Sequence, residues 1–420
     1  MKLHAIEKIL ARASGKNKVE TGEIINARVD VAMIHDRGGP RVADHLSKLN
    51  VEKVWDKEKV VIVFDHYVPP PTVQNAEAQK KFRAFIRKYG FTNVYLSGAG
   101  ICHQVVPEKG HAWPGAVIVG TDSHTTTYGA FGAFATGIGH TEMAYVLIFG
   151  ELWLKVPEIM RFNITGEMPP MVMAKDVTLK IAGEVGEEGA LYKAVEFSGP
   201  VIRKMDIDER MVFSNMSVEI GAKAGFIEPD EKTLAYVKGR IGKDIQPITT
   251  DPDYEYDSVF EVDVSQLEPQ IALPHSIAKV KPVSEVEGIE IDQAFIGSCT
   301  GGRLNDLRVA AKILKGRKVN PRVRMVIVPA SSEVYLNAVK EELINTFIEA
   351  GGIVCPPGCG PCVGGHMGVL ASGEVCISAG NRNFKGRMGS EDSLIYVASP
   401  AVVAASAIEG KITDPRKIFK

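Results

Sequence analysis

The chain has 420 residues, which at roughly 100–200 residues per domain predicts two or three domains. A hydrophobic content of 45% is enough for ordinary cores, and a formal net charge of −2 gives no overall attraction to nucleic acid or to an anionic membrane. No apolar run approaches the roughly 18 residues of a membrane-spanning helix, and residues 1–18 are amphipathic and too charged for a signal peptide. We therefore expect a soluble, cytoplasmic protein that begins with a helix and binds neither nucleic acid nor a membrane.

Short β-rich runs alternate with helical stretches, a pattern typical of α/β layers. The predicted strands are, in chain order, 59–64, 93–96, 116–120, 293–296, 324–328, 352–355, 374–378 and 394–398. Two helices are predicted among the later strands, at 304–314 and at 333–350, and Gly351 and Gly352 are expected to cap the second. Shifts in composition near 160 and 284 predict three domains, 1–160, 161–283 and 284–420.

Polar residues follow the ends of several predicted strands. In an open α/β sheet, ligands bind outside the carboxyl ends of the strands, so we expect these residues to converge on one cleft. They are Asp65, His66, Cys102, His103, the run 121–124, Cys299, Asn381 and Arg382.

Six cysteines are too few for a disulfide scaffold in a chain of this length, and a cluster of them is more typical of metal binding or redox work. The sharpest motif is C-x-x-C at Cys359 and Cys362. By itself this motif is consistent with a thioredoxin-like redox site, with a zinc site that uses Cys355 or Cys376 as well, or with an iron–sulfur site.

Cys299 lies at a strand end, in a turn of small residues that leads into a helix. A third cysteine in this position favours the iron–sulfur site. Three thiolates can hold a [4Fe–4S] cluster and leave one iron open for Lewis-acid work on an oxygen. The alternative is that Cys299 is only a small buried hydrophobic residue.

Histidines and carboxylates at the strand ends are candidates for acid–base chemistry, because a carboxylate fixes the tautomer of a histidine and raises its basicity. These candidates are Asp65, His66, His103, Asp122, His124 and Glu219. Asn215 and Glu219 lie four residues apart in a predicted helix and so share a face, although ordinary surface polarity would give the same pattern. Arg382 and Arg387 could grip a substrate carboxylate, or could belong to a solvated loop.

Together these motifs resemble the aconitase superfamily, and the resemblance covers nearly the whole chain in the family's order. The length is similar to that of the separate large subunits in its isopropylmalate dehydratase and homoaconitase group. The matching segments are VAMIHD, FDHYVPP, GAGICHQV, GTDSHTTTYGAFGAFATGIGHTE, SNMSVEIGA, FIGSCT, GCGPCVGG and NRNFKGRMG.

The resemblance implies one [4Fe–4S] cluster per subunit, held by Cys299, Cys359 and Cys362. It implies catalytic or orienting roles for Asp65, His66, His103, Asp122, His124 and Glu219. The implied substrate contacts are His35, where aconitases proper carry glutamine, and Ser123, Asn215, Asn381, Arg382 and Arg387. One departure is Gly301, since the family often has asparagine two residues after the first cluster cysteine.

The resemblance further implies three-layer α/β/α domains around a cluster-bearing cleft. The implied reaction is dehydration and rehydration of a hydroxy di- or tricarboxylate. The first candidate is the conversion of 2-isopropylmalate to 3-isopropylmalate in leucine biosynthesis. Homoaconitase and 2,3-dimethylmalate dehydratase are the alternatives within the group. The family's swivelling domain, with its base serine, has no matching motif here. It is expected in a small partner subunit, in a heterodimer or heterotetramer.

Three alternatives belong to other classes. A thiol redox protein would use Cys359 and Cys362 but would leave Cys299 without a role. A zinc-stabilised structural protein would use the same cysteines. An RNA-binding regulator is disfavoured by the near-neutral charge.

Overall fold

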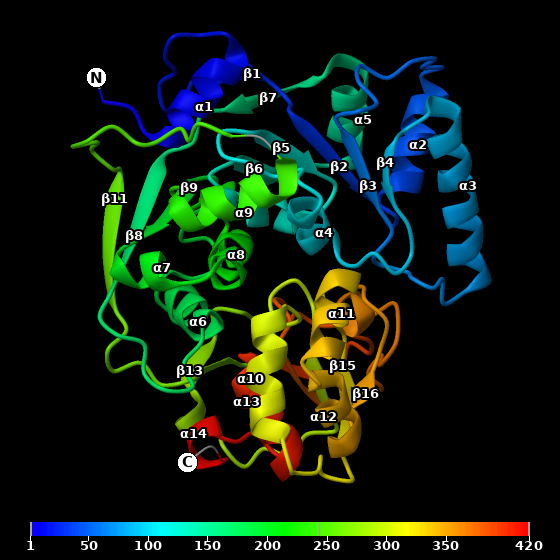
Figure 1. Ribbon diagram of the computed structural model, residues 1–420, viewed down its shortest axis with the longest axis vertical. Helices are drawn as coiled ribbons and strands as arrows, with labels where there is room; N and C mark the ends of the chain where they lie inside the picture. The colour runs from blue at the N-terminus through cyan, green and yellow to red at the C-terminus, as the bar shows by residue number, and fades with distance from the viewer. Residues whose placement is uncertain (1, 243, 419–420) are drawn as a thin grey trace.

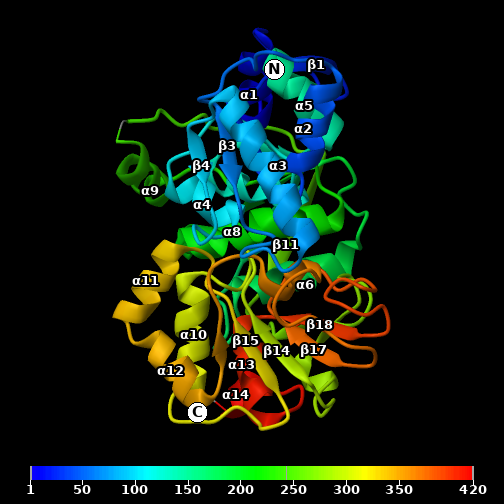
Figure 2. The same ribbon diagram turned by 90° about the vertical axis from the view of Figure 1, so that its right-hand side faces the viewer.

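Parallel strands covered by helices make up most of the computed structural model, which describes residues 2–242 and 244–418 (Figures 1 and 2). The first sheet is fully parallel, in the order β4-β3-β2-β5-β6. Its strands are β2 (Val31–His35), β3 (Val60–Val63), β4 (Asn93–Tyr95), β5 (Val117–Gly120) and β6 (Phe134–Gly137). The predicted α/β class is confirmed.

Helices cover both faces of this sheet, which is why β2, β3 and β5 are buried on both sides and consist largely of Val and Ile. One face packs against α2 (Gly39–Lys48), α3 (Val73–Tyr89) and α5 (His140–Phe149). The other packs against α4 (Cys102–Glu108) and the 3₁₀ segment η1 (Ser123–Phe131).

The N-terminal segment forms the predicted helix, α1 (Ala5–Ser14), beside the two-stranded sheet of β1 (Ile24–Arg28) and β7 (Glu151–Lys155). A second parallel sheet has the order β10-β9-β8-β11. Its strands are β8 (Ile159–Thr165), β9 (Ala194–Ser198), β10 (Ala224–Phe226) and β11 (Ser258–Asp263). Its helical segments are α6 (Ala174–Val185), α7 (Pro200–Lys204), α8 (Ile207–Met216), η2 (Ser217–Ile220) and α9 (Glu231–Ile241).

The third sheet, in the lower half of Figure 1, has seven strands in the order β13-β12-β18-β17-β14-β15-β16. They are β12 (Gln270–Ala272), β13 (Val280–Pro282), β14 (Gln293–Ile296), β15 (Arg324–Ile327), β16 (Ile353–Val354), β17 (Val375–Ser378) and β18 (Leu394–Ala398). The helical segments of this part are η3 (Val283–Glu285), α10 (Leu304–Leu314), α11 (Ser332–Lys340), α12 (Leu343–Ala350), η4 (Gly360–Val363), α13 (Pro400–Glu409) and α14 (Pro415–Ile418).

Helices α10 to α13 pack on one face of this sheet, while the other face contributes to the core that contains α6. Strands β12 and β13 precede residue 283, yet they pair in this sheet. The three domains and their boundaries stay predictions.

The sequence-based prediction of one helix over 333–350 is wrong. Two helices, α11 and α12, are separated at Glu341 and Glu342, and Glu342 has a left-handed φ of 59°. The Glu341 carboxylate accepts two hydrogen bonds from Arg308 on α10, at 2.7 and 2.6 Å. Glutamate is a good helix former, so nothing local marks this break. The predicted cap is confirmed, since Gly351 ends α12 with φ of 96°.

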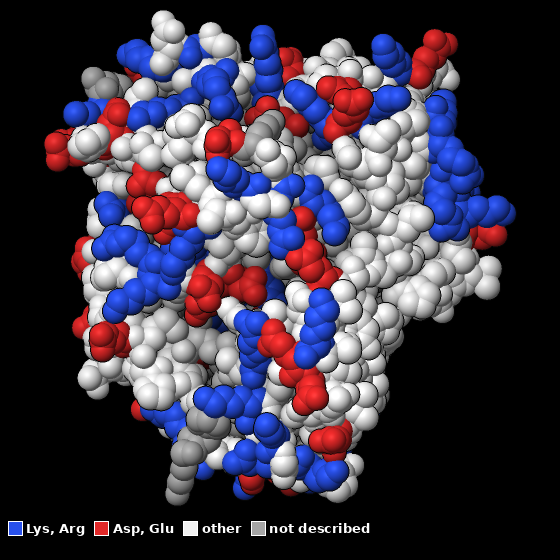
Figure 3. All heavy atoms as spheres, viewed as in Figure 1, with Lys and Arg blue, Asp and Glu red and all other residues white. Residues whose placement is uncertain are grey.

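The carboxyl ends of the first and third sheets face each other. The backbone N–H of Ile101 donates to the carbonyl of Ala330 at 2.8 Å, and that of Cys359 donates to the carbonyl of Asp65 at 2.9 Å. On the face drawn in Figure 3, charges of both signs are mixed, and Lys and Arg gather along α3. Among the described residues, no helix is long and apolar enough to cross a membrane.

Candidate active site

The facing strand ends enclose a cavity of about 290 Å³. Most of the predicted site residues line it, namely His35, His66, His103, Asp122, Ser123, His124, Cys299, Cys359, Cys362, Asn381, Arg382 and Arg387. The remaining three, Asp65, Asn215 and Glu219, lie behind the residues that line the cavity and form hydrogen bonds with them. The structure therefore brings together side chains that are more than 300 positions apart.

Asp122 is the hub of the histidine network. Its Oδ1 lies 3.0 Å from His103 Nε2 and 3.3 Å from His124 Nδ1, and its Oδ2 lies 3.5 Å from His66 Nε2. Burial raises the pKa of Asp122, but its hydrogen bonds and the charges of these histidines outweigh burial and lower the pKa well below its usual range. The carboxylate thus stays ionised and orients three imidazoles.

Asp65 and His66 form a buried ion pair, with Asp65 Oδ1 2.6 Å from His66 Nδ1. Burial raises the pKa of Asp65, yet His66 outweighs burial and the pKa falls to about 2. Burial likewise lowers the pKa of His66, but the nearby Cys359 and Asp65 raise it well above its usual value. The ion pair with Asp65 thus favours the protonated form of His66, and Nε2 is directed toward the Asp122 side of the cavity.

His35 stacks on His66, with ring centroids 4.2 Å apart. Its Nε2 lies 3.1 Å from the carbonyl of Thr121, and its Nδ1 accepts from the Gly38 N–H at 3.1 Å, which together fix one neutral tautomer. Burial and the positive charge of His66 lower the pKa of His35 to about 4, so this ring stays neutral.

Glu219 connects the second sheet's helices to the cavity. Its carboxylate lies 2.6 Å from His124 Nε2 and accepts from Arg382 Nε at 2.9 Å. The predicted helix changes to the 3₁₀ segment η2 after Met216, so Glu219 lies outside the regular α-helix that holds Asn215. Both side chains are buried, which excludes ordinary surface polarity as their explanation.

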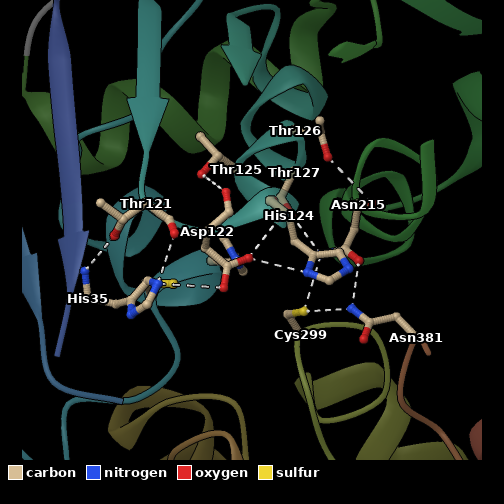
Figure 4. A network of polar contacts seen from close by, with 12 residues as sticks. His35, Thr121, Asp122, His124, Thr125, Thr126, Thr127, Asn215, Cys299 and Asn381 are labelled. Carbon is tan, nitrogen blue, oxygen red and sulfur yellow. Dashed lines mark hydrogen bonds and ion pairs between the residues drawn. The ribbon is translucent and has the colours of Figure 1, made fainter. Parts of the chain in front are cut away.

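Three buried cysteines line the floor of the cavity: Cys299 after β14, and Cys359 and Cys362 around η4. Amide nitrogens of Asn215 and Asn381 lie 3.2 and 3.4 Å from Cys299 Sγ. Figure 4 shows Cys299 and Asn381, which follow strands β14 and β17 of the third sheet, approaching Asn215 and His124.

Arg387 Nη2 lies 3.5 Å from Cys362 Sγ. Donors of this kind favour thiolates, whereas burial raises the pKa of Cys299 and Cys359. Burial thus disfavours the free thiolate at Cys299 and Cys359, so these two cysteines are poorly suited to act as free nucleophiles.

The other cysteines differ in position. Cys102 also lines the cavity, and its backbone N–H donates to Asp65 Oδ2 at 2.8 Å. Cys355 and Cys376 do not line it, and Cys376 lies within β17. The C-x-x-C motif begins a short 3₁₀ segment rather than an α-helix, unlike the arrangement expected of a thioredoxin-like motif.

Sequence reasoning missed four residues at the site. Buried Asp36 accepts the backbone N–H groups of Asp65 and His66 at 3.1 and 2.9 Å and so shapes their loop. Its position directly after a buried strand was an available signal. Arg37, Arg41 and His140 line the cavity at its rim. His140 lies in the matching segment that ends in GIGHTE, whereas no motif marks the two arginines in the sequence.

Comparison with known proteins identifies the class to which this fold and site belong. The model of the aconitase family (aconitate hydratase) matches residues 7–287 and 276–410, so the chain belongs to the aconitase family.

Full-length relatives narrow the comparison. The chain is 55% identical to the 3-isopropylmalate dehydratase large subunit 1 of Methanopyrus kandleri, over 98% of each chain. It is 52% identical to the probable methanogen homoaconitase large subunit of Methanothermobacter thermautotrophicus, over 99% of this chain and 98% of that one. It is 50% identical to the 3-isopropylmalate dehydratase large subunit of Aquifex aeolicus, over 99% and 97%.

Proposed function

We propose that this chain is the large subunit of a hydro-lyase that converts 2-isopropylmalate to 3-isopropylmalate by dehydration and rehydration. The observation that carries the proposal is one cavity in which three histidines surround a single aspartate. The same cavity holds the cysteines Cys299, Cys359 and Cys362 and the arginines Arg382 and Arg387. Full-length identity of 55% and 50% to two proteins named 3-isopropylmalate dehydratase large subunit supports the substrate.

The three cysteines fit a [4Fe–4S] cluster. All three are buried and line the cavity. Cys299 receives N–H donors from Asn215 and Asn381, and Cys362 receives one from Arg387, which is the environment that stabilises thiolate ligands. When bound, the cluster would supply an open iron that acts as a Lewis acid on the substrate hydroxyl.

The chain's own residues would bind the substrate and move its protons. His66, held protonated by Asp65, would protonate the departing hydroxyl from Nε2. Arg387 and Arg382 would bind a substrate carboxylate, and the ion pair of Arg382 with Glu219 would fix its orientation.

The base that removes the carbon-bound proton would come from a small partner subunit. We expect the reconstituted chain alone to be nearly inactive, because general base catalysis contributes about 10²–10⁴-fold. Adding a small subunit should restore turnover. The measurement is hydration of the unsaturated intermediate, followed by ultraviolet absorbance under anaerobic conditions, and the unsaturated acids that correspond to 2-isopropylmalate, homocitrate and 2,3-dimethylmalate are compared as substrates. Full turnover by this chain alone would contradict the assignment of the base.

A second candidate, homoaconitase, is favoured by the rim of the cavity. Arg37 and Arg41 lie there with His140, whose pKa is lowered by burial and by these arginines. Among the described residues, neither arginine forms an ion pair, so both are available to a third carboxylate on the substrate's variable arm.

We therefore expect Arg37→Gln and Arg41→Gln each to lower kcat/KM for a tricarboxylate by roughly 10- to 100-fold, the value of a charge-assisted hydrogen bond. A dicarboxylate with an alkyl arm should be converted at about the wild-type rate. Arg87→Gln, which changes an exposed arginine of α3 outside the cavity, is the matched control. Equal losses for both substrates would contradict a role in selecting the arm.

A further inference from the structure

A buried lysine lies behind the three-cysteine site. Lys175, on α6, is 1% exposed, and its Nζ donates to Thr300 Oγ1 at 2.6 Å and to the carbonyls of Ala379 and Gly380 at 3.0 and 2.6 Å. These acceptors satisfy all three N–H bonds of the ammonium group. All three are neutral oxygens, although a lysine is almost never fully buried without a charged partner.

The acceptors belong to the two loops that hold Cys299 and its amide donor. Thr300 directly follows Cys299, and Gly380 directly precedes Asn381, which donates to Cys299 Sγ at 3.4 Å. Thr300 Oγ1 also donates to the carbonyl of Ala379 at 3.2 Å. Lys175 therefore fastens the loop after β14 to the loop after β17 from a helix of the second sheet.

The unusual Gly301 is part of this arrangement. A Cβ at this position would lie 2.4 Å from Ala379 Cβ and 2.7 Å from the carbonyl oxygen of Ala379. Only glycine allows the two loops to approach closely enough for Thr300 and Ala379 to share one ammonium group. The departure from the family's asparagine thus has a steric reason in this chain.

The charge of Lys175 acts on the cysteines as well. Burial lowers the pKa of Lys175 to about 8, and the negative charges of Asp306, Cys299 and Cys362 act in the opposite direction. The ammonium group is therefore within electrostatic reach of two of the three cysteines. A buried charge is poorly screened, so it affects the thiolates more than a surface lysine would.

We propose that Lys175 is a positioning residue for the three-cysteine site, which holds the Cys299 and Asn381 loops together and offsets the negative charge of the thiolates and of the group they bind. The inference rests on the proposed function, because it requires that the cysteines hold an iron–sulfur cluster. Lys175 does not line the cavity, so it acts through the two loops and through its charge, without touching substrate.

The test compares Lys175→Met, which keeps the chain length without the charge, with Lys175→Arg, which keeps the charge. After anaerobic reconstitution, iron and sulfide per chain and the midpoint potential of the cluster are measured, the potential by a redox titration followed by electron paramagnetic resonance. Removing a nearby positive charge makes reduction of the cluster less favourable. Lys175→Met should therefore bind less iron and shift the potential to a more negative value, and Lys175→Arg should return the potential toward that of the wild type.

The matched control is Lys232→Met, since Lys232 also donates to two backbone carbonyls, those of Lys204 and Met205, but outside the site. It should leave the potential unchanged. Wild-type iron content and potential in Lys175→Met would overturn the proposal. Failure of the wild-type chain itself to bind a cluster would instead overturn the proposed function.

A second variant keeps the test decisive if Lys175→Met does not fold. Thr300→Val removes one acceptor and keeps the charge, so it should speed the loss of iron to a chelator while the potential stays at the wild-type value. Loss of iron at the wild-type rate would overturn the proposal that Lys175 holds the two loops together.

Discussion

Serine in place of Cys299, Cys359 or Cys362 is expected to abolish turnover and to leave the reconstituted chain with little iron or sulfide. Each sulfur is buried on the cavity floor, and a serine hydroxyl is a poor ligand for iron in a thiolate cluster. The measurement is iron and sulfide per chain, with visible absorbance, after anaerobic reconstitution.

Two other cysteines provide the controls for this experiment. Cys376→Ser changes a buried cysteine of β17 outside the cavity and should keep the cluster. Cys102→Ser is the stricter comparison, because Cys102 lines the same cavity. If Cys102→Ser lost the cluster while Cys299→Ser kept it, the three proposed ligands would be wrong.

Replacing His66 with Gln is expected to lower kcat on the order of 10²–10⁴-fold, the usual contribution of a general acid. Cluster content should stay near that of the wild type, since the imidazole is proposed to act on the substrate. His111→Gln is the matched control. His111 is a half-buried histidine whose Nε2 lies 2.7 Å from the Tyr95 hydroxyl, outside the cavity lining.

The pH profile separates this role from a structural one. Asp65 raises the pKa of His66, so Asp65→Asn should lower that pKa. The protonated form would then be lost at a lower pH, and the alkaline fall in kcat should move to lower pH in Asp65→Asn than in the wild type. If kcat fell at the same alkaline pH in both enzymes, the assignment of His66 as the general acid would be wrong.

The sequence by itself determined the α/β class, several central strands of the first and third sheets, and most residues of the candidate site. The buried strands β3 and β5 carry short Val and Ile runs, which are local signals, and polar residues after their ends point to one edge of a sheet. Cys299, Cys359, Cys362 and the histidines were found from such positions and from the order of the motifs.

Only the tertiary structure decided how these groups act on one another. Asp122 contacts three histidines, Asp36 supports the loop of Asp65, and Lys175 joins two loops. All of these contacts link segments that are far apart in the sequence, so no local pattern predicts them. The break between α11 and α12 has the same origin, because Arg308 of another helix holds Glu341 at the interruption. Propensity and periodicity describe one segment at a time, whereas burial, charge and proton state are set by what the fold places around each side chain.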